Sequence, residues 1–217
     1  MRSKLILIVF SVLVYWILMY YVPYGRYVIL PIHLFVTFLH EFGHSMAAIL
    51  TGGNVHEVFI QTNGAGYAVT AGGSQAVILM GGYLGSALWG NLLLYIGLCK
   101  PKSSLFTLYV VIFILLFTAF VWYSSALTSF ILVTFSVLAF WMGRKSKRNV
   151  ATLLMVLGAT SIVYIMMDYK TGPSSDLAKF AELFPILPKG AWALVWLGVV
   201  IWMTWVTLKK AVKRSIG

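Results

Sequence analysis

The sequence predicts an all-α polytopic membrane protein with six or seven transmembrane helices and a short β-hairpin or re-entrant segment after the second helix. Its composition is the first reason, because 61% of the 217 residues are hydrophobic and only 10% are charged. A soluble domain is usually about a quarter charged, so this chain has too little polar surface to face water. Long apolar runs separated by short basic clusters are the second reason. We treat residues 1–217 as a single integral membrane domain.

Each predicted helix is an apolar run of about 20 residues, the length that spans a bilayer. The first, residues 4–22, begins like a signal peptide, but it lacks a small-residue cleavage site and we expect it to be retained. The run from 104 to 142 is too long for one crossing at about 1.5 Å per residue, so we expect a break near Trp122–Ser125. The other predicted spans are residues 27–50, 75–99, 150–167 and 189–208.

Two segments lack the composition of a membrane span. Residues 53–70 are rich in β-branched and aromatic residues around Asn63-Gly64, a pattern that predicts a β-hairpin. Residues 168–188 hold three of the five acidic residues together with three prolines. We expect a loop and a short helix there, followed by a break before the last span.

The net charge of +11 limits the choice of partners. The basic residues gather in short clusters, such as 143–149 and 209–214, between or after the apolar runs. This placement favours topology signals and contacts with anionic lipids over nucleic-acid binding, so we expect a lipid bilayer and no nucleic acid as partner. The distribution of these charges leaves six and seven crossings open. Cys99 is the only cysteine, which excludes an intrachain disulfide and a cysteine metal cluster.

The sequence HEFGH, residues 40–44, lies inside the apolar run 27–50. On a helix, His40 and His44 lie on one face one turn apart and can reach one ion. Glu41 falls beside that ion, where it can take a proton from a water, as in zinc hydrolases. The alternative is structural: the histidines hydrogen-bond to neighbouring helices and Glu41 is paired or protonated. Ionisable residues within a span are rare and usually functional, so we favour the zinc site.

The sequence resembles the site-2-protease family of intramembrane zinc metalloproteases, in its compact bacterial branch without a PDZ domain. HEFGH carries the resemblance together with the glycine-rich segment MGGYLGSALWGNLLLY and an acidic motif before the last span, covering roughly residues 27–99 and 168–208. The resemblance implies cleavage of a transmembrane protein substrate within a bacterial cytoplasmic membrane, with zinc as cofactor. It also implies that the carboxyl end of the motif helix faces the cytoplasm. A regulatory membrane partner stays unidentified.

The third metal ligand has few candidates. His33 lies two turns before His40, roughly 10 Å along the helix axis, which is too far to bind the same ion. His56 and Glu57 belong to the predicted hairpin and can stay at the membrane interface. Asp168 and Asp176 are then left.

The resemblance favours Asp176, because the compact branch carries Ser-Asp before a small or apolar residue, as residues 175–178 do here. The well-known Asn-Pro-Asp-Gly and Leu-Asp-Gly contexts are absent. The structural alternative for Asp176 is a helix N-cap, and for Asp168 a helix end paired with Lys170. We expect Asp176 to bind the metal, with Asp168 as the alternative ligand.

Two further segments are expected to support the site. Small residues in the glycine-rich span allow close helix packing, which could hold that span against the motif helix; they are Gly81, Gly82, Gly85, Ser86 and Gly90. Asn91 in the same span is expected to make an interhelical hydrogen bond. An exposed strand edge of the hairpin could bind an unwound substrate by strand addition, although it could equally be a plain connection.

The function that we predict is therefore an intramembrane zinc metalloprotease. His40, His44 and Asp176 hold zinc, and Glu41 activates the water and passes its proton to the leaving amine. The alternative from another class is a non-enzymatic metal-binding membrane protein, either a transporter or an inactive protease homologue. Such a protein needs metal ligands but no base beside them.

Overall fold

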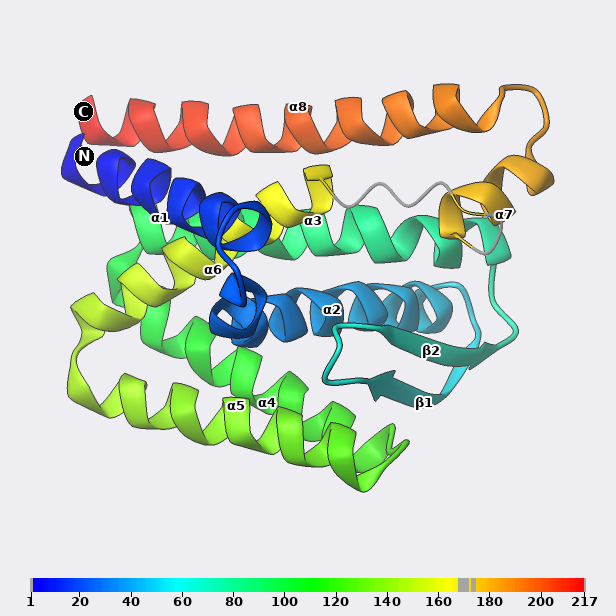
Figure 1. Ribbon diagram of the computed structural model, residues 1–217, viewed down its shortest axis with the longest axis horizontal. Coiled ribbons are helices and arrows are strands. Elements are labelled where there is room, and N and C mark those ends of the chain that lie inside the picture. Colours follow the sequence, from blue (N-terminus) through cyan, green and yellow to red (C-terminus); the bar gives the residue numbers. More distant parts are fainter. Residues whose placement is uncertain (1, 168–171, 173–174, 217) are drawn as a thin grey trace.

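A computed structural model of the chain is a bundle of helices with one small β-hairpin (Figure 1). The structure describes residues 2–167, 172 and 175–216. In chain order the elements are α1 (Arg2–Tyr20), α2 (Gly25–Leu50), β1 (Asn54–Ile60), β2 (Gly66–Ala71), α3 (Gln75–Cys99), the 3-10 helix η1 (Pro101–Ser103), α4 (Ser104–Val121), α5 (Ala126–Lys145), α6 (Lys147–Met167), α7 (Asp176–Leu183) and α8 (Lys189–Ile216).

Within the described part of the chain, six helices are long and apolar enough to cross a membrane, which confirms the predicted fold class. The long run also divides where the sequence predicts, because α4 ends at Val121 and α5 begins at Ala126. The Ser125 hydroxyl caps α5 by accepting a hydrogen bond from the Thr128 amide at 3.2 Å. The six candidate segments are Ser3–Tyr20, Gln75–Cys99, Pro101–Val121, Ala126–Arg144, Arg148–Met167 and Lys189–Arg214.

The motif helix α2 is not one of these six. It has 26 residues, long enough at about 39 Å to cross a bilayer. Its sequence includes three histidines and one glutamate, His33, His40, Glu41 and His44. Its apolar side chains Phe38 and Leu39 are fully buried in the core. Residues 34–48 of the helix therefore lie mostly inside the protein, where packing fixes the orientation of the polar side chains.

The predicted hairpin forms an antiparallel pair of strands directly after α2. The outer edge of β1 is already occupied by the connection between α4 and α5 and by the first turn of α5. The Val58 amide donates to the Trp122 carbonyl at 3.0 Å, and the Ile60 amide donates to the Thr128 hydroxyl at 3.1 Å. Within the described residues the sheet has only these two strands, so the outer edge of β2 has no strand partner.

Glycines allow α3 to approach two neighbouring helices closely. On one side, a Cβ at Gly43 of α2 would collide with the Gly81 carbonyl of α3. On the other side, a Cβ at Gly90 of α3 would lie 3.1 Å from the Gly158 carbonyl of α6. The predicted small-residue face thus packs against α2 near its start and against α6 farther along. The Asn91 amide donates to the Thr204 hydroxyl of α8 at 3.4 Å, the interhelical bond that the sequence predicts.

Candidate metal centre

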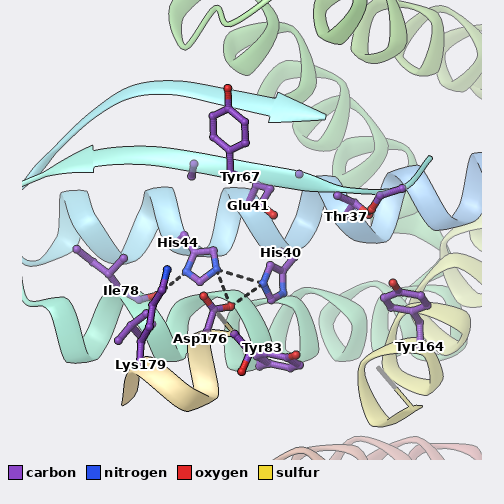
Figure 2. Close-up of a pocket in the computed structure, with 15 residues that line it drawn as sticks. Thr37, His40, Glu41, His44, Tyr67, Ile78, Tyr83, Tyr164, Asp176 and Lys179 are labelled. Carbon is purple, nitrogen blue, oxygen red and sulfur yellow. Dashed lines mark hydrogen bonds and ion pairs between the residues drawn. The ribbon is translucent and has the colours of Figure 1, made fainter. Parts of the chain in front are cut away.

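The two histidines of the motif point toward one another from one face of α2 (Figure 2). Their Nε2 atoms lie 3.1 Å apart. The ring planes of His40 and His44 meet nearly at right angles, at 84°. The i, i+4 spacing on a regular helix places the two side chains on the same face, one turn apart.

Asp176, the first residue of α7, completes the group from a position distant in sequence. Its Oδ2 atom lies 3.1 Å from His40 Nε2 and 3.2 Å from His44 Nε2. The three atoms therefore form a nearly equilateral triangle. Zinc–ligand distances of about 2.0–2.1 Å place tetrahedral ligand atoms about 3.3 Å apart, so these residues fit a zinc ion. Within the described residues they are the one group of this kind.

The outer nitrogen of His44 fixes the orientation of its ring. His44 Nδ1 donates a hydrogen bond to the Ile78 carbonyl of α3 at 2.6 Å. A carbonyl only accepts, so the proton is on Nδ1 and the Nε2 lone pair faces the group of three. Metal-binding histidines are usually held in this way.

Asp176 is presented as a ligand and not as a helix cap. Ser175 caps α7 by accepting a hydrogen bond from the Ala178 amide at 3.2 Å, so the N-cap interpretation of Asp176 is wrong. The buried side chains of Leu177 and Phe180 anchor the short helix. Burial raises the pKa of the Asp176 carboxyl, but the adjacent imidazoles of His40 and His44 outweigh this effect and lower the pKa below its usual range. The carboxylate is thus in the form that binds metal.

The alternative ligand, Asp168, lies outside the described residues. The other acids and histidines occupy different places. His33 Nε2 is 2.8 Å from the Tyr164 hydroxyl, in agreement with its exclusion on the basis of helix geometry. His56 and Glu57 lie on β1 and are not members of the group.

Glu41 lies in the same cavity and is buried, with 5% of its surface exposed. Its side chain projects toward β2 (Figure 2). A Cβ at Gly66 would lie 3.0 Å from Glu41 Cγ and 2.8 Å from Thr37 Cγ2. The strand backbone therefore passes directly against the glutamate. Only glycine at position 66 allows this approach.

Gly82 of α3 leaves the space beside the two histidines open. A Cβ at this position would lie 2.6 Å from His40 Nε2 and would also collide with His44 Nε2. Any side chain at position 82 would occupy the place that a shared ion needs. The sequence predicts a small-residue face on α3, but it does not indicate which glycine lies at the metal centre.

The cavity has a volume of about 360 Å³ and is lined by residues of α2, β2, α3, α6 and α7. Sequence reasoning missed several of its lining residues, because they have no motif and come together only in three dimensions. The edge of the Tyr83 ring packs against His40, with centroids 5.0 Å apart. Thr37, Tyr164 and Lys179 are among the other lining residues that the sequence did not indicate.

Comparison with protein families gives one match. The family described as Peptidase M50B-like matches residues 5–207, which include the whole candidate centre and the middle helices that the resemblance in the sequence did not cover. No curated protein and no solved structure matches the chain significantly.

Proposed function

We propose that this chain, which belongs to the M50B-like peptidase family, is an intramembrane zinc metalloprotease that hydrolyses peptide bonds of transmembrane proteins. The single observation that carries the proposal is the convergence of His40, His44 and Asp176 beside the buried carboxyl group of Glu41. Three ligands with a glutamate in the same cavity are the set that a catalytic zinc site uses, because the fourth position stays open for reaction.

In this mechanism the histidine nitrogens and the Asp176 carboxylate would hold zinc. When bound, zinc supplies Lewis-acid polarisation and makes water acidic enough to ionise near neutral pH. The Glu41 carboxylate accepts the proton of the attacking water and then donates it to the leaving amine nitrogen. Burial of Glu41 against β2 limits the access of bulk water to this proton.

The free edge of β2 supports a route for the substrate. A helical substrate must unwind before its carbonyl can be attacked, because helix hydrogen bonds occupy the peptide groups. Gly66, Tyr67 and Ala68 of β2 line the cavity, whereas the outer edge of β1 is bonded to the α4–α5 connection. An unwound segment that pairs with β2 would lie directly over Glu41.

The test compares purified wild-type protein with Glu41→Gln in metal content and in cleavage of a co-expressed membrane substrate. We expect about one zinc per chain in both proteins, and cleavage only in the wild type. Unchanged cleavage in Glu41→Gln would exclude the protease mechanism. Zinc in both proteins with cleavage in neither, across a panel of membrane substrates, would support a non-enzymatic metal-binding protein.

The proposal also covers the membrane location of the protein and its partners. Six apolar helices make the chain an integral membrane protein, and we assign it to a bacterial cytoplasmic membrane. Its partners would be the transmembrane substrate and the lipid bilayer. Fractionation of cells that express the protein, followed by cross-linking through the cavity residue Tyr67, would test both assignments.

A further inference from the structure

We propose that the metal centre lies toward the extracytoplasmic face of the membrane, so that the carboxyl end of α2 points away from the cytoplasm. This replaces the orientation that the resemblance to site-2 proteases implies. The proposal depends on the direction of each helix in the bundle and on which end carries the positive charges.

The directions of α1 and α2 follow from their contacts along α3. The Lys4 ammonium donates to the carbonyl of Leu98, near the end of α3, at 2.9 Å. At the other end of α3, His44 near the end of α2 donates to the carbonyl of Ile78, near the start of α3. Between them, α1 passes into α2 where Gly25 packs against Leu18. The two helices therefore run one after the other in the same direction, opposite to α3 (Figure 1).

The position of the metal centre along the bundle follows from the same contacts. Gly82 lies beside both ligand histidines. It is seven residues from Gln75, about 10 Å along the helix axis, and 17 residues from Cys99, about 26 Å. The centre therefore lies close to the end of the bundle where α3 begins, together with the hairpin and α7.

Helix termini from several parts of the chain meet at the opposite end. Arg214 and Lys4 are near enough to Cys99 to influence its thiol electrostatically. A Cβ at Gly143, near the end of α5, would contact Leu105 at the start of α4. Figure 1 shows the ends of α1 and α8 side by side there. The described basic side chains at this end are Lys4, Lys100, Lys102, Arg144, Arg148, Lys209, Lys210, Lys213 and Arg214.

The end that holds the metal centre has far fewer basic side chains. Among the described residues they are Lys179 of α7 and Lys189 at the start of α8, and the acidic residues Glu57, Asp176 and Glu182 lie at the same end. Arg26 lies between the two ends, where α1 meets α2. Short loops rich in Lys and Arg stay in the cytoplasm. The basic end is therefore cytoplasmic, and the centre faces the other side.

The consequence for substrates rests on the proposed function. A scissile bond must reach a cavity that lies near the extracytoplasmic boundary and opens beside the hairpin. The substrate class is then a transmembrane protein that is cut close to the extracytoplasmic end of its membrane segment. A bond near the cytoplasmic end of the same segment would lie more than 20 Å from the centre, by the helix rise.

Single-cysteine variants test the orientation, because Cys99 is the only cysteine and Cys99→Ser supplies a blank background. Gly190→Cys reports on the end with the metal centre, where an added Cβ meets nothing within 4 Å. Lys102→Cys is the matched probe at the basic end, and it is also exposed. Intact cells are treated with a membrane-impermeant maleimide, with permeabilised cells as the measure of complete labelling.

We expect complete labelling of Gly190→Cys in intact cells and loss of labelling of Lys102→Cys unless the membrane is permeabilised. The reverse pattern, or equal labelling of both in intact cells, would overturn the proposal. Asn63→Cys in the exposed hairpin turn is a second probe if Gly190→Cys does not accumulate, and zinc content reports whether each variant is folded. The labelling needs no catalysis, so an inactive protein leaves the orientation result unaffected.

Discussion

Glycines bring α3 close to both α2 and α6, but the two contacts serve different purposes. Toward α6, Gly90 and Gly158 allow the backbones to touch, and the space is filled by Ile162 and Leu94. Toward α2, Gly43 and Gly81 also allow the backbones to approach closely. Here, however, Gly82 leaves a space beside polar side chains. The comparison shows that one kind of residue can either close a helix interface or reserve room for an ion.

Gly82→Ala should have the largest effect on this comparison. Its Cβ would lie 2.6 Å from His40 Nε2, in the space that the ion needs, so we expect complete loss of bound zinc and of cleavage. Metal analysis of purified protein measures the first, and a substrate-cleavage assay measures the second. Gly90→Ala is the matched control and should keep its zinc. Normal zinc in Gly82→Ala would show that the space beside this glycine is not the metal position.

Asp176→Ala should have the next largest effect, because it removes one of three ligand atoms but leaves the space open. We expect zinc affinity to fall by more than the roughly 10–100-fold typical of losing a hydrogen-bond partner of a ligand. Competition with a zinc chelator measures the affinity. Asp168→Ala is the comparison variant and should bind zinc as the wild type does. The opposite ranking would assign the third ligand to Asp168.

Gly158→Ala should affect the contact between α3 and α6 without reaching the metal centre. The added Cβ would lie 2.5 Å from the Gly90 carbonyl oxygen and from the Leu94 nitrogen. Overpacking of this kind costs about 1–3 kcal/mol of stability. Thermal unfolding in detergent should show a lower Tm, while the folded fraction keeps its zinc. Loss of zinc at normal stability would mean that the two interfaces are not independent.

Tyr67→Asp should reduce cleavage without changing metal content. Tyr67 lines the cavity from β2, whose outer edge has no strand partner among the described residues, and an exposed charge there would disfavour an apolar substrate segment. We expect kcat/KM for a membrane substrate to fall about 10-fold, the equivalent of about 1.4 kcal/mol. Asn63→Asp in the hairpin turn is the control for charge alone. Equal cleavage by all three proteins would count against strand addition at β2.

Thr204→Val should have the smallest effect. The hydrogen bond from Asn91 to the Thr204 hydroxyl is long at 3.4 Å, and bonds between transmembrane helices average only about 0.6 kcal/mol. We expect stability to change by less than about 1 kcal/mol, with zinc content and cleavage unaltered. A larger loss in denaturant unfolding would indicate that α8 depends on this bond.

The parts of the site that follow from local periodicity were predictable. Four-residue spacing on a helix places His40 and His44 together, and apolar composition defines the spans. The break between α4 and α5 and the hairpin around Asn63-Gly64 also follow from local signals. Whether α2 spans the membrane was harder to judge from hydropathy. The polar residues of its metal site lower the mean hydropathy by which membrane spans are recognised.

Contacts between distant segments were not predictable in the same way. The sequence reduced the third ligand to two aspartates. Only the packing of α7 against α3 and α8 places the Asp176 carboxylate 3.1 Å from His40. Likewise, the i, i+4 glycine pattern of α3 does not say which glycine contacts α2 and which contacts α6. Both outcomes depend on how whole helices pack, and no short stretch of sequence contains that information.

The sequence by itself determined a membrane-embedded helical protein with two histidines and a glutamate poised on one helix. Helical periodicity and hydrophobicity depend on residues that are close together in the sequence, so both can be read directly from the chain. Tertiary structure alone decided which aspartate joins the histidines, which strand edge is left without a partner, and that α1 and α2 run in the same direction. Each of these outcomes depends on contacts between residues more than 60 positions apart in the sequence. Such contacts are determined by how the helices and their side chains pack together.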